Sequence, residues 1–161
     1  MRILVISDSH GQSERVKSLL VKYADEVHAV LHLGDLDRDL LKHEGSTELR
    51  LLAVAGNCDN TLSSPHERLL TLGRRKILMV HGNQYIVNQN TDRLACRALE
   101  QEADICLFGH THIAETFTDG NVFYMNPGSI TNPRDDKNPS YGLLTIDEET
   151  GGVSGEIIFD E

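Results

Sequence analysis

The chain has 161 residues, and 25 acidic residues against 15 basic ones give a formal net charge of −10. A chain of this length is predicted to fold around one core, so we expect a single domain over residues 1–161. The acidic balance argues against an electrostatic grip on long nucleic acids or anionic membranes. Three cysteines without a paired spacing predict neither a disulfide framework nor a thiolate zinc site.

The distribution of apolar residues favours the cytoplasm. The first residues enter an apolar run that is too short for a signal peptide, and no run approaches the roughly 20 residues that a membrane span needs. We therefore expect a cytoplasmic protein without membrane contact. A homodimer is the default expectation for its assembly.

The first half of the chain alternates apolar runs with a helical pattern. Residues 2–6 (RILVI) are predicted to form a buried strand. Ser13 can cap the helix that follows. One face of that helix is apolar, with the period of 3.6 residues: Val16, Leu19, Leu20 and Tyr23. Further strands are predicted at residues 27–33, 49–55 and 76–80.

The second half begins in the same way and then changes to strands alone. Thr91 can cap a helix with these residues on its apolar side: Leu94, Ala95, Ala98 and Leu99. A strand at residues 105–108 follows it. The remaining strands have no helix between them, which predicts an antiparallel tail: residues 114–118, 122–125, 141–146 and 153–159. Together the two halves predict an α/β domain with mixed sheets.

Polar donors directly follow five of the predicted strands. They are Asp8 and His10, Asp35, Asn57, His81, and His110 and His112. Ligands of open α/β sheets lie beyond the carboxyl ends of the strands, so we expect these side chains to converge. In an extended segment residues i and i+2 point the same way, so the Asp-Ser-His and His-Thr-His sequences can each chelate a cation. Seven oxygen or nitrogen donors suffice for two metal ions.

These clusters resemble the ordered motifs of the calcineurin-like metallophosphoesterases. They read Asp8-Ser9-His10, Gly34-Asp35-Leu36-Asp37, Gly56-Asn57-Cys58-Asp59, His81-Gly82 and Gly109-His110-Thr111-His112. The resemblance extends from residue 1 to about residue 134, and the short distances between motifs are similar to those of the small bacterial and archaeal phosphodiesterase branch. It implies a four-layer α-β-β-α sandwich with two mixed sheets and a metal-dependent phosphoesterase.

The resemblance also implies how the donors divide between two ions that share the Asp35 carboxylate: Asp8, His10 and His112 around one, Asn57, His81 and His110 around the other. Asp35, Asn57 and His81 would also be catalytic. Ions about 3.5–4 Å apart clamp phosphate oxygens and turn a bridging water into hydroxide near neutral pH. Manganese is the metal expected from the family, with nickel, iron, cobalt and zinc left open because these ligand types accept all of them.

Three residues near the motifs bear on the substrate. Many phosphatases of the wider family carry His where this chain has Cys58, and because a thiol is a poor proton donor we favour hydrolysis of a small-molecule phosphodiester. The favoured interpretation of Cys58 itself is a small buried packing residue. Asp59 can orient a ligand or a water, or equally can cap a turn. Arg134 can reach a phosphate, although lone exposed arginines are usually solvated; it belongs to an irregular stretch, residues 126–139, that we expect to be functional or mobile.

Other functions of the same family stay open. A phosphomonoesterase or a nuclease would use the same chemistry, and the retromer-associated subunit is a scaffold without catalysis. Degraded ligands would indicate a scaffold, and all seven donors are present here. The histidines outside the motifs are interpreted as structural or surface residues: His28, His32, His43 and His66.

Overall fold

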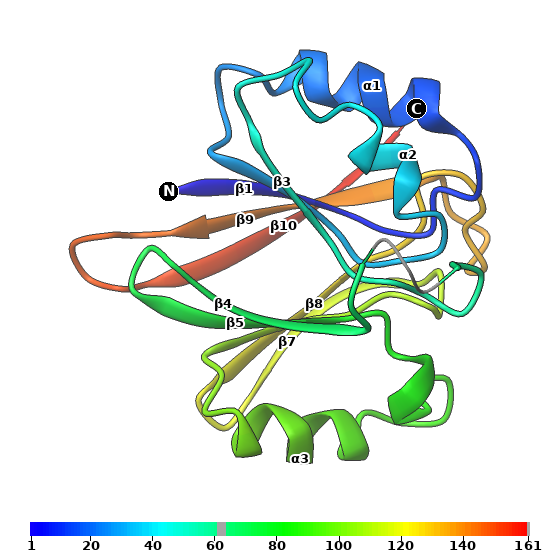
Figure 1. Ribbon diagram of the computed structural model, residues 1–161. Helices are drawn as coiled ribbons and strands as arrows, with labels where there is room; N and C mark the ends of the chain where they lie inside the picture. The colour runs from blue at the N-terminus through cyan, green and yellow to red at the C-terminus, as the bar shows by residue number, and fades with distance from the viewer. Residues whose placement is uncertain (61–63, 161) are drawn as a thin grey trace.

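Two five-stranded sheets lie face to face, with helices on their outer sides (Figure 1). This is seen in a computed structural model, which describes residues 1–60 and 64–160. Helices α1 (Ser13–Lys22) and α2 (Arg38–Leu41) cover the first sheet, and α3 (Asp92–Glu100) covers the second. The layers therefore follow the order α-β-β-α, and the predicted fold class is confirmed.

The first sheet has the strand order β10-β9-β1-β2-β3. Its strands are β1 (Arg2–Ile6), β2 (Ala29–His32), β3 (Arg50–Ala53), β9 (Ser140–Ile146) and β10 (Val153–Phe159). Strands β1, β2 and β3 are parallel, while β9 is antiparallel to both β1 and β10. The carboxyl ends of the three parallel strands thus meet at one edge.

The second sheet has the order β4-β5-β6-β8-β7. Its strands are β4 (Glu67–Leu72), β5 (Arg75–Val80), β6 (Ile105–Leu107), β7 (Ala114–Asp119) and β8 (Val122–Pro127). A short 3-10 helix, η1 (Asn83–Tyr85), follows β5. Strands β5, β6 and β8 are parallel, with β4 and β7 antiparallel at the two edges.

The predicted antiparallel tail is divided between the sheets. The β7–β8 hairpin belongs to the second sheet, where β8 also pairs in parallel with β6, and the β9–β10 hairpin completes the first sheet beside β1. The tail is therefore antiparallel within each hairpin, as predicted, but it does not form one antiparallel unit, because the hairpins join different sheets and β8 is parallel to β6. Local patterns identify hairpins, but the sheet that a hairpin joins is decided by contacts distant in sequence.

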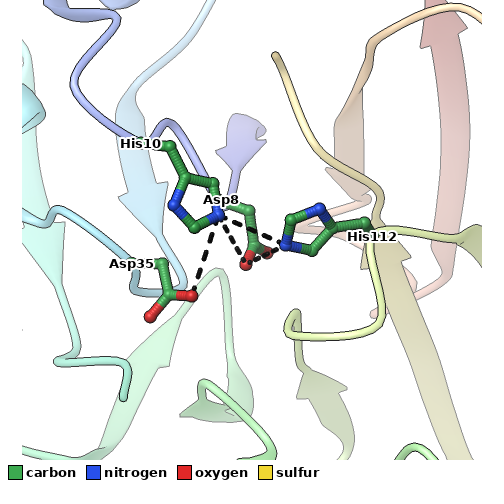
Figure 2. Close-up of side chains that lie close together, drawn as sticks. All are labelled: Asp8, His10, Asp35 and His112. Carbon is green, nitrogen blue, oxygen red and sulfur yellow. Dashed lines mark hydrogen bonds and ion pairs between the residues drawn. The ribbon is translucent and has the colours of Figure 1, made fainter. Parts of the chain in front are cut away.

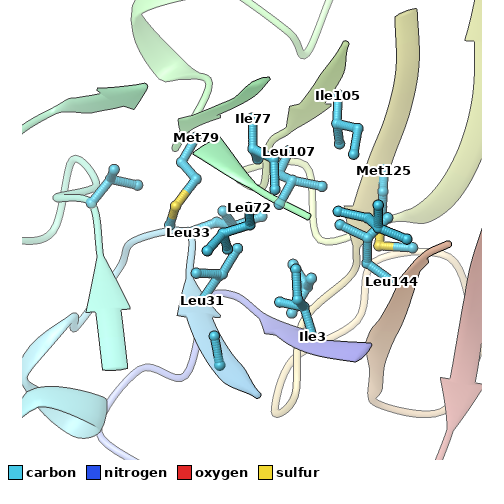
Figure 3. Close-up of a cluster of buried hydrophobic side chains, with 14 residues drawn as sticks. Ile3, Leu31, Leu33, Leu72, Ile77, Met79, Ile105, Leu107, Met125 and Leu144 are labelled. Carbon is cyan, nitrogen blue, oxygen red and sulfur yellow. The ribbon is translucent and has the colours of Figure 1, made fainter. Parts of the chain in front are cut away.

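Alternating side chains send apolar residues to both faces of each sheet. Ile3 and Val5 of β1 face the second sheet, where they join a cluster that includes Ile77 and Leu107 (Figure 3). Their neighbours on β1 pack instead against the apolar face of α1, with this cluster: Leu4, Ile6, Val16, Leu19 and Leu20. Each fully buried aliphatic side chain contributes about 1.5–3 kcal/mol, so these layers hold the strand ends in place.

The predicted helix caps are not made. Helix α1 begins at Ser13 itself, and the hydroxyl of Ser13 lies 3.3 Å from His43 Nε2. Thr91 occupies the cap position of α3, but it accepts the Ala95 N–H through its backbone carbonyl and makes no side-chain cap bond. Leu99, predicted on the apolar face of α3, is 69% exposed, while Leu94 is fully buried.

Other differences concern the limits of elements. The strands predicted at residues 27–33 and 49–55 are shorter at both ends, and β4 and α2 were not predicted. Strand β4 carries charged and exposed side chains because it is a sheet edge, which obscures the apolar pattern. Among the described residues, no helix combines the length and apolar character needed to cross a membrane.

Candidate metal centre

All the predicted donors lie at one edge of the two sheets. Each lies in the loop that follows the carboxyl end of a parallel strand: Asp8 and His10 after β1, Asp35 after β2, Asn57 after β3, His81 after β5, and His110 and His112 after β6. Contacts between the sheets join them, as between His112 Nε2 and Asp8 Oδ1 at 3.1 Å. The expected convergence is therefore present.

Four of these side chains form a first group. The potential ligand atoms of Asp8, His10, Asp35 and His112 all lie within 4.8 Å of one another (Figure 2). His10 Nε2 is 3.3 Å from His112 Nε2 and 3.8 Å from Asp35 Oδ2. Asp8, Asp35 and His112 are buried, whereas His10 is exposed. The group is thus enclosed by protein except on the side of His10.

The other donors gather on the opposite oxygen of Asp35. His81 Nε2 lies 3.4 Å from Asp35 Oδ1 and 3.1 Å from Asn57 Oδ1. His110 Nδ1 lies 3.2 Å from His81 Nε2. One carboxylate oxygen of Asp35 therefore faces each group, as a shared ligand requires.

Hydrogen bonds to the backbone orient two of the imidazoles. The Nδ1 atom of His81 is 2.7 Å from the Leu33 carbonyl, and that of His112 is 2.6 Å from the Asn132 carbonyl. Because a carbonyl only accepts, each Nδ1 carries the proton and each neutral ring presents the Nε2 lone pair to the centre. Both rings are thereby held in the tautomer that binds a cation.

A buried oxygen of Asp8 indicates what the centre is built to hold. Its Oδ2 accepts from the Ser7 hydroxyl at 2.5 Å and from the His110 N–H at 3.1 Å. Its Oδ1 is buried and accepts no hydrogen bond among the described residues, because His112 Nε2, 3.1 Å away, presents a lone pair in the tautomer described above. Such an oxygen is costly to bury alone, and carboxylate, amide and imidazole donors around it suit a divalent cation. The residues present fit a metal ion.

The charges of the centre support one another. Burial opposes ionisation of Asp8 and Asp35, but the neighbouring histidines outweigh it and lower the pKa of both carboxyls. Burial also opposes protonation of His81 and His112, but the same carboxylates outweigh it. The net effect is that the pKa of both rings is raised. Protons and cations therefore compete for these nitrogens.

The backbone of the donors is strained and is held from a distant loop. The φ angles of Asp8 (54°) and His112 (61°) lie in the left-handed region, as do those of His10, Asp35 and His110. The hydroxyls of Ser129 and Thr131 donate to the Asp8 carbonyl at 2.8 and 3.1 Å. With the Asn132 contact to His112, the loop expected to be functional or mobile supports both ends of the first group.

The structure bears differently on the predictions for the three residues near the motifs. Cys58 is exposed, so its interpretation as a buried packing residue was wrong. Its backbone N–H donates to Asp35 Oδ1 at 2.9 Å, and desolvation and the nearby carboxylates raise the pKa of its thiol. The carboxylate of Asp59 accepts backbone N–H groups, including that of Asp35, and not the side chains of the predicted metal ligands. The side chain of Arg134 is exposed, and its backbone N–H donates to the His112 carbonyl at 3.3 Å.

A buried network behind the donors was missed from the sequence. Ser9 Oγ lies 2.9 Å from His32 Nε2 and donates to Asp39 Oδ2 at 2.7 Å, while the Gly34 N–H donates to His32 Nδ1 at 3.1 Å. It ties together the loops that follow β1 and β2. The nearest signal was His32 at the end of an apolar strand, which was interpreted only as structural.

Comparisons with known proteins agree with this geometry. Residues 1–149 match the family model of the calcineurin-like phosphoesterase superfamily domain. The chain is 36% identical to the probable metallophosphoesterase YsnB of Bacillus subtilis over 95% of this chain and 89% of that protein. A crystal structure of a predicted phosphoesterase from Streptococcus pneumoniae has a TM-score of 0.81 at 32% identity, covering 98% of this chain and 97% of that one.

A third relative is wild-type Vps29 of Entamoeba histolytica in complex with Zn²⁺. Its TM-score is 0.75 at 26% identity, over 99% of both chains. The matches cover nearly the whole of this chain, including every strand end that carries a donor. The chain therefore belongs to the calcineurin-like phosphoesterase superfamily.

Proposed function

We propose that this chain is a divalent-metal-dependent phosphodiesterase that hydrolyses a small-molecule phosphate ester at a two-metal centre. The observation that carries the proposal is the division of the six other donors into two groups, one on the side of each Asp35 carboxylate oxygen. In this assignment Asp8, His10 and His112 would hold one ion, and Asn57, His81 and His110 would hold the other. The ligand types do not select a metal, and manganese is proposed from the family.

The side chains of this chain would hold the ions and set the direction from which the ester approaches. Divalent ions bound here would act as Lewis acids on the phosphate oxygens and activate water for attack on phosphorus. Asp35, Asn57 and His81, the proposed catalytic residues, meet where the two groups join. Because His10 and Asn57 are exposed while Asp8 is buried, the ester would approach from the side of the exposed donors.

The loop after β3 favours a diester over a monoester. Cys58 lies beside the proposed bridge, and desolvation together with the nearby carboxylates raises the pKa of its thiol, which makes it a still weaker acid. Without a strong proton donor at this position, departure of a poor leaving group is unassisted. An ester with a good leaving group needs less assistance. The net charge of −10 further favours small esters over long nucleic acids.

A scaffold without catalysis is the second candidate, supported by the similarity to Vps29. That relative was solved with Zn²⁺, so metal binding alone does not separate the two functions. Hydrolysis does separate them. The presence of all seven donors supports the enzyme.

The test combines metal analysis with substrate comparison. The purified protein is assayed with Mn²⁺ on bis(p-nitrophenyl) phosphate, p-nitrophenyl phosphate and single-stranded DNA, before and after EDTA treatment. We expect fastest hydrolysis of the diester, its loss with EDTA, and at least about a 100-fold lower rate in Asp35→Asn, since a shared ligand is weakened. Unchanged metal content and rate in Asp35→Asn would disprove the bridging role. Absence of hydrolysis on every substrate and metal would favour the scaffold.

A further inference from the structure

The carboxylate of Asp59 accepts four backbone hydrogen bonds. Its Oδ2 accepts the N–H groups of Asp35 at 2.9 Å and Gly56 at 2.7 Å. Its Oδ1 accepts those of Leu36 at 2.8 Å and Asp37 at 3.1 Å. Three of these N–H groups belong to consecutive residues of the loop after β2, and the fourth belongs to the loop after β3. A half-buried side chain that touches none of the proposed ligand atoms thus joins two loops of the centre.

The backbone that Asp59 holds is an unfavourable one. Asp35 and Leu36 have consecutive positive φ angles of 59° and 72°. Leucine rarely adopts the left-handed region, because its Cβ approaches the carbonyl oxygen, so this loop needs external contacts to keep its shape. Three N–H groups pointing at one carboxylate are such contacts. They also direct the Asp35 side chain toward both groups of donors.

The same carboxylate fixes the loop that carries Asn57. The Gly56 N–H and the Asp59 N–H, which donates to the Gly56 carbonyl at 3.3 Å, close a tight turn around Asn57. From this turn the Cys58 N–H reaches Asp35 Oδ1 at 2.9 Å. The positions of Asp35 and Asn57 therefore both depend on Asp59.

We propose that Asp59 is a positioning residue that sets the metal affinity of the centre by holding Asp35 in its bridging position. The proposal rests on the proposed function. It combines the two roles open from the sequence, orienting a ligand and capping a turn, because the observed contacts order a ligand loop and a turn together. Removing such an outer support is expected to weaken metal binding about 10–100-fold.

The substitution Asp59→Asn tests this with little change in size. An amide has a single oxygen, so its NH₂ group would face two of the four N–H donors. Asp147→Asn is the matched control, since Asp147 Oδ1 also accepts two backbone N–H groups, from Glu149 and Thr150. It lies in the turn after β9, which runs antiparallel to β1, at the sheet end opposite to the centre (Figure 1). Asn at 147 keeps an oxygen acceptor there.

The measurement is a Mn²⁺ titration of each metal-free protein by calorimetry, with melting temperature and diesterase rate in parallel. We expect Asp59→Asn to raise the Mn²⁺ Kd about 10–100-fold and to recover kcat at saturating Mn²⁺, with Asp147→Asn within about twofold of wild type. A purely structural role would lower the melting temperature and leave the Kd of the folded fraction unchanged.

Asp59→Glu provides a second variant, which keeps the charge and both oxygens but displaces them by one methylene group. It should bind Mn²⁺ with an intermediate Kd. Any folded variant at this position that binds Mn²⁺ within about threefold of wild type overturns the inference. Failure of the wild-type protein to bind metal or hydrolyse any ester would instead refute the proposed function, so the two failures are distinguishable.

Discussion

The stability of the metal-free protein should depend on pH through His32, which is fully buried. Because Nδ1 accepts the Gly34 N–H, the proton of the neutral ring lies on Nε2 and is donated to Ser9. A second proton on Nδ1 would face the Gly34 N–H. Burial lowers the pKa of this ring from 6.5 to about 4, and nearby carboxylates such as Asp8 and Asp39 only partly oppose the shift.

The sign and size follow from linkage. The unfolded chain binds this proton more tightly than the folded protein, so stability is full above pH 6.5 and is lost as the pH falls toward 4. The whole shift corresponds to about 3 kcal/mol. The part between pH 7 and pH 5 is about 2 kcal/mol, calculated for a proton bound with pKa 6.5 in the unfolded state and about 4 in the folded state. No discount for solvent applies to a fully buried ring.

The assay is urea denaturation of the metal-free protein at pH 7 and pH 5, compared with His32→Gln, which cannot titrate. The raised pKa values of His81 and His112 change stability above pH 6.5 and in the opposite direction, and the lowered pKa of His110 changes it in the same direction as His32. Both proteins contain these three histidines, so the comparison isolates the contribution of His32. The wild type should lose about 2 kcal/mol more than the variant on going to pH 5. Equal losses in the two proteins would refute the reasoning.

Two further predictions concern the centre and the core. A Cβ on Gly56 would lie 2.5 Å from the Asp35 nitrogen and overlap its carboxylate oxygen, so Gly56→Ala should raise the Mn²⁺ Kd at least about tenfold. Gly45→Ala, whose Cβ meets nothing within 4 Å, should leave that Kd unchanged, and equal Kd values for both variants would contradict the steric argument. Leu94→Ala should lower the free energy of unfolding by about 2–5 kcal/mol, because Leu94 is fully buried on the inner face of α3. Leu99→Ala, at a 69% exposed position, should change it by less than about 0.5 kcal/mol, and chemical denaturation that finds equal losses would show that α3 packs differently.

Much of the candidate site could be predicted because its signals are local. An apolar run followed directly by a polar donor places that donor at a strand end, and parallel strands bring such ends to one edge. Asp8, Asp35 and His112 all follow this rule. Strand β4 escaped prediction because its exposed position at a sheet edge removes the periodic pattern.

The supports of the site could not be predicted in the same way. Ser129 reaches the Asp8 carbonyl across 121 residues of sequence, and no local pattern marks either partner. Asp59 lies within a motif, but its four acceptor contacts exist only because the loops after β2 and β3 meet. Cys58 is exposed for a related reason, since its loop turns its backbone toward Asp35.

The sequence by itself determined the donor chemistry, the strand ends that present it and the alternation that forms the two-sheet core. Those properties depend on residue type and on the periods of strand and helix, which act over a few residues. Only the tertiary structure decided which oxygen of Asp35 faces which group, which hydrogen bonds hold the left-handed loops, and which sheet each hairpin joins. Such features arise from contacts between segments distant in the chain, and their geometry is fixed when the two sheets pack together.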